Sequence, residues 1–294
     1  MAESGVIIKG VGGLYTVIYH GQPYICPARG IFRKDSTKPM IGDLVALSEL
    51  DGSKQQAVIH SIFPRKNQMV RPAVANVDLV VLVMATRSPA PDLLLIDKLL
   101  LSAAQKEIAV AMVINKTDQD PSLADSWYEE YRCAVPHILR TCTRDGSGLA
   151  ELKELMAGKI AVMAGQSGAG KSSLLNLLMG TCVMETGTLS SKTHRGRHTT
   201  RHNEMFMTED GFIIDSPGFS LFEMEELCPL TLQNFYPEIY NNKGSCFYPD
   251  CSHTGEPKCF VPALVQQGLF SQGRYRRYQL LYRELKEREK NKYK

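Results

Sequence analysis

The chain has 294 residues, of which 44% are hydrophobic and 22% charged, as in ordinary soluble proteins of two or three domains. Its longest unbroken apolar runs, residues 79–85 and 108–114, are seven residues long, whereas a membrane-spanning helix needs about 20. Residues 1–13 lack the basic start and long apolar stretch of a secretory signal. We therefore expect a cytoplasmic protein without membrane contacts, whose eight cysteines are reduced and bind metal where they cluster.

The first 69 residues show short strands broken by turns. Residues 14–20 and 22–28 are separated by a His-Gly break, and residues 43–50 and 55–63 by an Asp-Gly turn signal. About five short strands in so few residues suit a small barrel of the OB type. A small sandwich or an SH3-like barrel remains open from the pattern alone.

Residues 70–221 alternate apolar strands with helical patterns, which predicts a mostly parallel α/β sheet with helices on both faces. The expected strands are residues 77–84, 108–114, 138–142, 159–164 and 212–215. The expected helices are residues 91–105, 122–131, 149–156 and 171–179. Residues 222–294 form a third zone, with a Cys/His cluster and a helical tail from about residue 273.

A phosphate-binding pattern, GQSGAGKS, occupies residues 165–172 between an expected strand and an expected helix. Its glycines let the backbone curl so that N–H groups face phosphate oxygens, and the helix N-terminus adds a positive field. Lys171 can reach the β- and γ-phosphates, and the Ser172 hydroxyl can ligate magnesium. The alternative, a glycine-rich turn that matches by chance, is disfavoured by the strand–loop–helix context.

The sequence NKTD follows an expected buried strand at residues 115–118. The Asp118 carboxylate offers two adjacent acceptors to the ring N–H and exocyclic amine of guanine, whereas adenine would leave this carboxylate unpaired. Asn115 is expected to tie adjacent loops together and contact the ring, and the Lys116 stem to cover the base. Alone, the four letters fit an Asx-turn equally well. Together with the phosphate loop they predict a guanine-nucleotide site.

These motifs occur in rotated order, because most small GTPases place the phosphate loop before NKxD. In this order, and in the ARG-x-FRK stretch at residues 28–34 and the C-terminal Cys/His cluster, the chain resembles the circularly permuted ribosome-biogenesis GTPases of the RsgA/YjeQ/YloQ type over essentially its whole length. The resemblance implies an OB-fold RNA-binding barrel (1–69), a circularly permuted GTPase domain (70–221) and a zinc-binding domain with a basic helical tail (222–294). Permutation is tolerated where the termini of a domain lie close together.

The resemblance also implies a function. Such proteins bind the small ribosomal subunit and its rRNA late in maturation, hydrolyse GTP to GDP and phosphate under stimulation by the subunit, and leave after hydrolysis. We expect a monomer, because no long heptad pattern indicates dimerisation. Two other classes remain open: a nucleotide-gated RNA-binding assembly factor with little turnover, and a phosphate-loop ATPase or kinase, against which Asp118 argues.

A DSPG segment at residues 215–218 looks like the DxxG motif of GTPases, although a proline-containing turn would also fit. Asp215 would hold magnesium through water, and the Gly218 N–H would bond the γ-phosphate. In the Gly/His/Arg/Thr-rich loop before it, one threonine should ligate magnesium when GTP is bound. We favour Thr200 over Thr199, because family-like loops place this threonine directly before an arginine.

The catalytic group is less obvious. Many GTPases place a glutamine after DxxG to orient the attacking water, but this chain has Phe219, whose ring cannot hydrogen-bond water. The resemblance points to His198 for that task, with a solvated loop histidine as the alternative. Without a glutamine or an arginine finger, the free enzyme should turn over at about 10⁻⁴–10⁻² s⁻¹.

Two sets of residues are therefore expected to serve GTP or GDP with magnesium. The nucleotide-binding set is Asn115, Lys116, Thr117, Asp118, Gly165, Gln166, Ser167, Gly168, Ala169, Gly170, Lys171, Ser172 and Ser173. The catalytic set is Lys171, His198, Thr200 and Gly218, and the magnesium ligands are Ser172, Thr200 and Asp215. The resemblance adds a backbone contact from residues 141–143 to the guanine carbonyl.

A Cys/His cluster follows the pattern C-x4-C-x-H-x5-C, with ligands Cys246, Cys251, His253 and Cys259. Three thiolates and one imidazole make the closed tetrahedral set typical of structural zinc. The spacing differs from the common finger patterns, so a redox pair or ordinary buried cysteines remain open from spacing alone. The resemblance, in which this spacing recurs, implies one structural zinc ion.

The C-terminal tail is basic. From residue 274 onward there are nine Lys/Arg and three Glu, a net +6 against +3 for the whole chain, so the remainder sums to −3. Its interleaved tyrosines and cations could stack RNA bases and bind phosphates. The alternative is a solvated terminal helix that packs Leu280, Leu281 and Leu285 on the body. The accompanying barrel and zinc module favour RNA binding.

Overall fold

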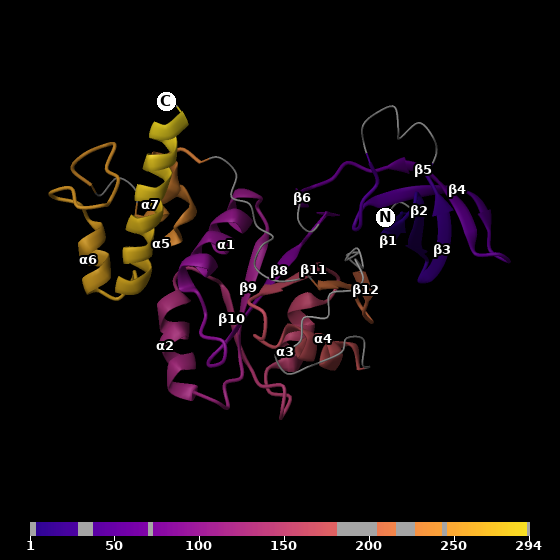
Figure 1. The fold of residues 1–294 in the computed structure, drawn as a ribbon, viewed down its shortest axis with the longest axis horizontal. Coiled ribbons are helices and arrows are strands. Elements are labelled where there is room, and N and C mark those ends of the chain that lie inside the picture. Colours follow the sequence, from indigo (N-terminus) through magenta and orange to yellow (C-terminus); the bar gives the residue numbers. More distant parts are fainter. Residues whose placement is uncertain are drawn as a thin grey trace, which may run out of the picture.

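The structure is a computed structural model that describes residues 4–28, 38–69, 73–180, 205–215, 227–242 and 246–292. Three parts follow one another along the long axis of the molecule (Figure 1): an N-terminal barrel, a central sheet with helices, and a C-terminal helical domain. The predicted architecture is confirmed. No helix in these described ranges is both long and apolar enough to cross a membrane.

The N-terminal part is a closed five-stranded barrel with strand order β1-β2-β3-β5-β4. Its strands are β1 (Gly5–Val11), β2 (Leu14–Tyr19), β3 (Gln22–Pro27), β4 (Leu44–Asp51) and β5 (Gln56–Ile62). Alternate residues such as Ile7, Val17 and Ile59 fill the interior, because successive side chains of a strand point to opposite faces. Closure through β1 and β4 leaves no unpaired edge at that seam.

The central sheet has six strands in the order β10-β9-β8-β11-β13-β12. The first five are parallel, and β12 pairs antiparallel with β13 at the edge. The strands are β8 (Leu79–Ala85), β9 (Ala109–Asn115), β10 (His137–Thr141), β11 (Ile160–Gly165), β12 (Met205–Met207) and β13 (Phe212–Asp215). Every residue of β8 is buried, as expected for a strand covered on both faces.

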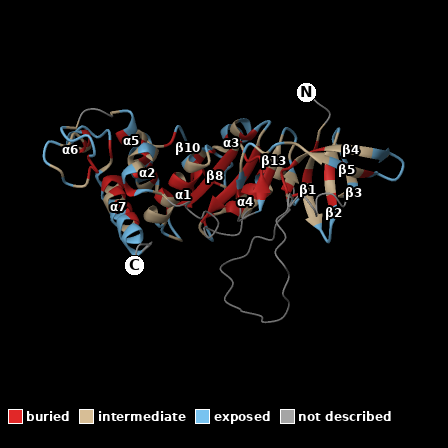
Figure 2. Ribbon diagram, turned by 90° about the horizontal axis from the view of Figure 1, so that it is seen from above, coloured by how far each residue is buried: buried red, intermediate tan, exposed pale blue. Residues whose placement is uncertain are grey.

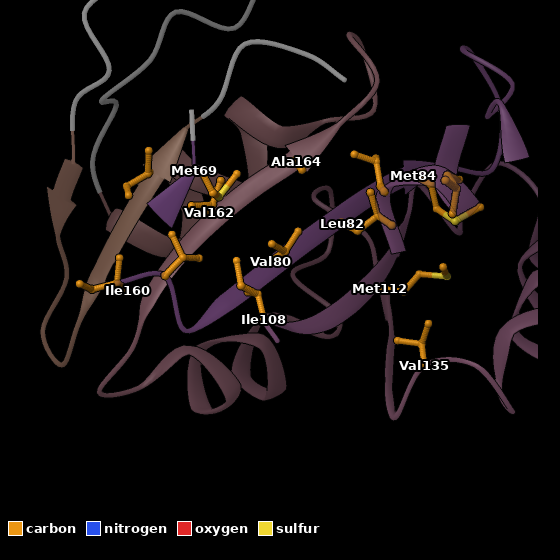
Figure 3. Close-up of a cluster of buried hydrophobic side chains, with 14 of the residues drawn as sticks. Met69, Val80, Leu82, Met84, Ile108, Met112, Val135, Ile160, Val162 and Ala164 are labelled. Carbon is orange, nitrogen blue, oxygen red and sulfur yellow. The ribbon is translucent and has the colours of Figure 1, made fainter. Parts of the chain in front are cut away.

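Helices cover both faces of this sheet. Even-numbered residues of β8, such as Val80 and Leu82, pack on the side of α1 (Leu93–Gln105) and α2 (Pro121–Tyr131), in the core shown in Figure 3. Odd-numbered ones, such as Val81, pack on the side of α3 (Leu149–Met156) and α4 (Lys171–Met179). The order of crossovers therefore places α3 and α4 on the face opposite α1 and α2.

A short ribbon, β6 (Gln68–Met69) with β7 (Val74–Ala75), joins the barrel to the sheet. Ala75 N–H donates to Ile41 O (2.8 Å), and the Asn76 amide donates to Gly42 O (2.9 Å). Asp43, which is fully buried, pairs with Arg65 at 2.6 Å. The barrel is thus fastened by hydrogen bonds to the ribbon that leads into the sheet, as well as by chain connection.

The C-terminal domain is built from η2 (Pro229–Phe235), α5 (Pro237–Tyr240), α6 (Val261–Gln266) and the long helix α7 (Gln272–Lys292). Its core contains the buried tyrosines Tyr275, Tyr278 and Tyr282 and includes Leu101 from α1. Figure 2 shows buried residues on the side of α7 that faces the other helices and exposed ones towards its C-terminal end. These tyrosines are core residues, so the expectation that they stack RNA bases is wrong.

Two arginines of the basic tail also face the body of the protein: Arg274 is buried and Arg277 is half-buried. Arg274 donates to Asp97 of α1 and to Glu238 of α5, both at 2.6 Å. Arg277 donates to Asp97 at 2.5 Å and to Glu130 of α2 at 2.6 Å. These contacts fix α7 against two helices of the central domain.

Candidate nucleotide-binding site and metal centre

The predicted nucleotide motifs converge at one edge of the sheet. NKTD begins at the end of β9, the phosphate loop follows β11, and Asp215 ends β13. Because these strands are parallel, their carboxyl ends share one edge, where open α/β sheets bind ligands. The chain turns to opposite faces after β8 and β11, which are neighbours in the sheet, so the crevice lies where these two strands diverge.

The phosphate loop needs glycine at both of its ends. Gly165 has φ +148°, and a Cβ there would lie 2.1 Å from Val83 O of the neighbouring strand. Gly170, at the start of α4, has φ +99°, and a Cβ there would lie 2.2 Å from Asn115 Nδ2. Both positions therefore combine a left-handed backbone with a close approach that no larger residue permits.

Lys171 folds back over the loop. Its ammonium donates to Gly165 O (2.7 Å) and Gln166 O (3.2 Å), and burial lowers its pKa while Asp215 opposes that shift. Burial likewise raises the pKa of Asp215, with Lys171 acting in the other direction. The buried Oδ1 of Asp215 has no hydrogen-bond partner among the described residues. An unsatisfied carboxylate oxygen near a serine-bearing phosphate loop fits a hydrated divalent cation such as magnesium.

Asn115 and Lys116 join the NKTD segment to the phosphate loop. The buried Asn115 amide donates to Ala169 O at 2.9 Å, and its oxygen accepts from the Thr141 hydroxyl at 3.1 Å. Lys116, with φ +59°, donates from its ammonium to Gly168 O at 2.8 Å. Two segments about fifty residues apart in sequence thus meet directly.

Asp118 lies at the open side of this arrangement, with its side chain 25% exposed. Its Oδ2 accepts from Arg144 Nη1 at 2.9 Å. Thr117 donates from its N–H to Thr141 O at 3.4 Å, which places the 141–143 segment beside NKTD. A carboxylate in this position can accept two adjacent donors from a planar ring, as guanine requires.

The structure brings together the predicted residues of NKTD and of the phosphate loop, with Ser172 and Ser173 half-buried in the first turn of α4. His198, Thr200 and Gly218 lie outside the described residues, so their predicted roles stay predictions.

Ser88 and Arg144 were not predicted from sequence. The Ser88 carbonyl accepts from the Lys116 ammonium at 2.9 Å. Its position after β8, another parallel strand, was the signal that could have identified it.

The Cys/His cluster forms a compact set in the C-terminal domain. One candidate ligand atom from each of the four residues lies within 4.8 Å of the others, in the set Cys246, Cys251, His253 and Cys259. Cys246 Sγ and Cys259 Sγ are 3.8 Å apart, and His253 Nδ1 lies 3.4 Å from Cys259 Sγ. The cluster could therefore hold one metal ion.

His253 is oriented for ligation through Nδ1. Its Nε2 lies 2.8 Å from Gln233 Oε1 of η2, a contact that fixes the ring and leaves Nδ1 towards the sulfurs. Burial lowers the pKa of His253, which favours the neutral imidazole that metals bind. The hydroxyls of Tyr275 and Tyr278 donate to the carbonyls of His253 (2.9 Å) and Ser252 (2.8 Å).

Comparison with known proteins identifies the family. Residues 62–225, more than half of the chain, match the family model of the RsgA GTPase. Residues 4–59 match the family model of the RsgA N-terminal domain. The chain belongs to the RsgA GTPase family. A relative from Ruminiclostridium cellulolyticum, the small ribosomal subunit biogenesis GTPase RsgA, is 41% identical, covering 97% of this chain and 94% of the relative. The RsgA of Agathobacter rectalis is 38% identical, covering 98% and 99%.

Two solved structures share the fold of this RsgA family member. YjeQ from Thermotoga maritima superposes with a TM-score of 0.80 at 33% identity, covering 96% of this chain and 98% of YjeQ. YloQ, a circularly permuted GTPase, gives 0.79 at 30% identity, covering 97% and 95%. The rotated motif order of this chain agrees with the circular permutation stated for YloQ.

Proposed function

We propose that this protein is a cytoplasmic, monomeric GTPase that binds the small ribosomal subunit and its rRNA during late maturation, hydrolyses GTP to GDP and phosphate under stimulation by the subunit, and is released after hydrolysis. The observation that carries the proposal is the contact between the guanine motif and the phosphate loop, through Asn115 to Ala169 at 2.9 Å and Lys116 to Gly168 at 2.8 Å. The small ribosomal subunit is proposed as the partner because relatives are named small ribosomal subunit biogenesis GTPase.

Each residue then has a task. Asp118 reads the guanine donors, and backbone N–H groups of residues 165–171 surround the phosphates. Lys171, which is held against Gly165 O, is placed to exchange that carbonyl for phosphate oxygens. Ser172, Thr200 and Asp215 would hold magnesium, which neutralises charge on the β- and γ-phosphates.

His198 orients the attacking water in this proposal, and the Gly218 N–H bonds the γ-phosphate. The assignment of His198 rests on the family resemblance and on Phe219, which cannot do this task. An unchanged turnover in His198→Ala, with nucleotide affinity intact, would remove it.

The Cys/His cluster holds one structural zinc ion in this proposal. Three thiolates and an imidazole fill a tetrahedral site completely, and Gln233 provides the supporting contact to the histidine. Metal analysis of the purified protein checks the identity of the ion, and one equivalent of zinc is expected.

The decisive experiment is GTP turnover titrated with isolated small subunits. Free enzyme should release phosphate at about 10⁻⁴–10⁻² s⁻¹, and saturating subunits should raise this rate. Turnover that stays negligible with subunits would support the nucleotide-gated assembly factor instead.

Affinity for subunits should differ between the GDP and GTP-analogue states, and equal affinities would refute nucleotide-coupled release.

A further inference from the structure

Two aromatic side chains, Phe247 and Tyr248, stand exposed on the loop between the first two cysteines of the cluster. Phe247 is 64% exposed and Tyr248 45% exposed. Their rings meet edge to face, with centroids 5.1 Å apart and an interplanar angle of 86°. We call this pair the aromatic tip. Single exposed apolar residues are ordinary on protein surfaces, but two adjacent exposed rings need an explanation.

Contacts on the C-terminal side of the aromatic tip restrain its backbone. Cys246 and Cys251 of the candidate metal site flank it on either side, and Cys251 N–H closes a turn onto Tyr248 O at 3.3 Å. The segment directly after it is fastened to α7 through the hydroxyls of Tyr275 and Tyr278. A ring held in place loses little conformational freedom on binding, so it can bind a planar partner more tightly than a ring on a flexible loop.

Within its own loop the aromatic tip has one cation and two acids nearby, and cations predominate only when those of α7 are included. The Lys258 ammonium lies over the Phe247 ring, 4.5 Å from its centroid. Two acids belong to the same loop, Asp250 and Glu256. Asp250 is exposed, but the Glu256 carboxylate already accepts from Ser252 N–H (2.8 Å) and Thr254 N–H (2.9 Å).

Further cations lie on α7, which packs on this loop. Arg276 and Arg283 are exposed there: Arg276 lies between the two tyrosines that hold the loop, and Arg283 follows Tyr278 by five residues. Exposed rings beside cations are the combination that single-stranded nucleic acids use, since bases stack on the rings and phosphates pair with the cations.

We propose that Phe247 and Tyr248 form a stacking platform for unpaired bases of ribosomal RNA, with Lys258 contacting the adjacent phosphate. This proposal rests on the proposed function and adds to it the residues of the C-terminal domain that contact RNA. The tail tyrosines are buried and cannot stack on bases, so the proposal assigns base stacking to the loop between the metal ligands.

The test uses the full chain loaded with metal and a non-hydrolysable GTP analogue. Affinity is measured for isolated small subunits and for a 12-nucleotide oligoadenylate strand. Phe247→Ala, Phe247→Leu and Tyr248→Ala should each weaken binding to both probes about fivefold to a hundredfold, the loss expected for one stacked base. Phe247→Trp should bind as well as the parent protein, because it keeps the ring. Metal content and subunit-free turnover should be unchanged in all four variants.

Tyr128→Ala is the matched control, since Tyr128 of α2 is also an exposed ring under a cation, the Arg140 guanidinium of β10, 5.0 Å from its centroid. This variant should bind both probes normally. Parent-like affinities in Phe247→Ala and Tyr248→Ala would overturn the proposal, as would failure of the parent protein to bind oligoadenylate. Retained subunit binding in Phe247→Leu would also overturn it, because an aliphatic side chain can fill a protein pocket but cannot stack. Subunit-stimulated turnover of the parent protein tests the proposed function separately.

Discussion

At the scale of single residues, Asp118 is the position on which nucleotide choice depends. Its carboxylate is one-quarter exposed and shares Oδ2 with Arg144, whose side chain is 77% exposed. An ion pair this exposed contributes about 0–1 kcal/mol to stability. Asp118 can therefore be changed without a large effect on folding, so a loss of binding in a variant reports on the base.

Asp118→Asn should weaken GTP binding about tenfold or more, because one of two adjacent acceptors becomes a donor that faces the exocyclic amine of guanine. Xanthosine triphosphate, which carries a carbonyl in place of that amine, should gain affinity. Competition of GTP, ATP and xanthosine triphosphate against a labelled guanine nucleotide measures both effects. Unchanged discrimination between the purines would mean that Asp118 does not read the base.

Gly170 offers a second residue-scale prediction. Gly170→Ala places a methyl group where the Asn115 amide lies, 2.2 Å away, so the loop and the NKTD segment must separate. We expect GDP affinity to fall about tenfold or more, because the N–H groups of the loop no longer point at the phosphates. Isothermal titration measures this change.

Gly158→Ala is the control for backbone strain in the Gly170→Ala experiment. Gly158 also has a positive φ, +69°, but a Cβ there has nothing within 4 Å. This variant should lose about 1–2 kcal/mol of stability and keep its GDP affinity. Equal effects of the two substitutions on GDP binding would show that strain alone, and not the Asn115 collision, disturbs the loop.

At this scale the sequence could predict the residues of the motifs but not the residues that contact and position them. Asn115, Lys171 and Asp215 belong to motifs whose chemistry requires those residue types. Arg144 is different, because nothing local distinguishes it from other surface arginines, and only the approach of β10 to β9 brings it to Asp118.

At the scale of elements, α7 is held in place by a cluster of ion pairs with little exposure to solvent. Arg274 is enclosed by Asp97 and Glu238, and its guanidinium also lies 4.6 Å from the centroid of the Tyr236 ring. The nearby carboxylates raise the pKa of Arg274 against the opposing effect of burial, so the side chain is charged in the folded protein. Removing one partner of such a group leaves the others buried and unpaired.

Arg274→Ala should therefore lower the free energy of unfolding by about 3–5 kcal/mol. Arg283→Ala, an exposed position on the same helix, should change it by about 0.5 kcal/mol or less. Urea titration followed by circular dichroism compares the two variants with the parent chain. Similar midpoints for both variants would show that the buried ion cluster does not stabilise α7.

Elements with strong periodicity could be read from the sequence. The expected bounds of α3, α4 and β13 agree with the structure residue for residue, because apolar spacing and flanking turn residues mark both ends. The strand β1 was not assigned, since Gly5 and Gly10 dilute its pattern, and β12 has only three residues. The short helices α5 and α6 were missed because their stability comes from packing around Tyr236 and Phe270.

At the scale of the whole molecule, α1 connects the nucleotide site with the C-terminal domain. The loop before α1 touches the site, since Ser88 O accepts from Lys116 at 2.9 Å. One turn into α1, Asp97 binds both Arg274 and Arg277 of α7. The C-terminal domain is thus attached to the central domain by this ion cluster as well as by the chain that follows Asp215.

This attachment limits how the domain can move with the nucleotide. A movement of the C-terminal domain relative to α1 would break charge-assisted hydrogen bonds in a buried setting, whereas a movement of α1 and α7 together would keep them. We therefore expect the distance between labels on α1 and α7 to be equal in the GDP and GTP-analogue states, with or without small subunits. Pulsed electron spin resonance on a pair of exposed labelled cysteines measures this distance. Asp97→Asn, which weakens the pairing, should broaden its distribution. If the parent protein instead shows a different α1–α7 distance in each nucleotide state, the ion cluster acts as a switch and not as a fixed mount.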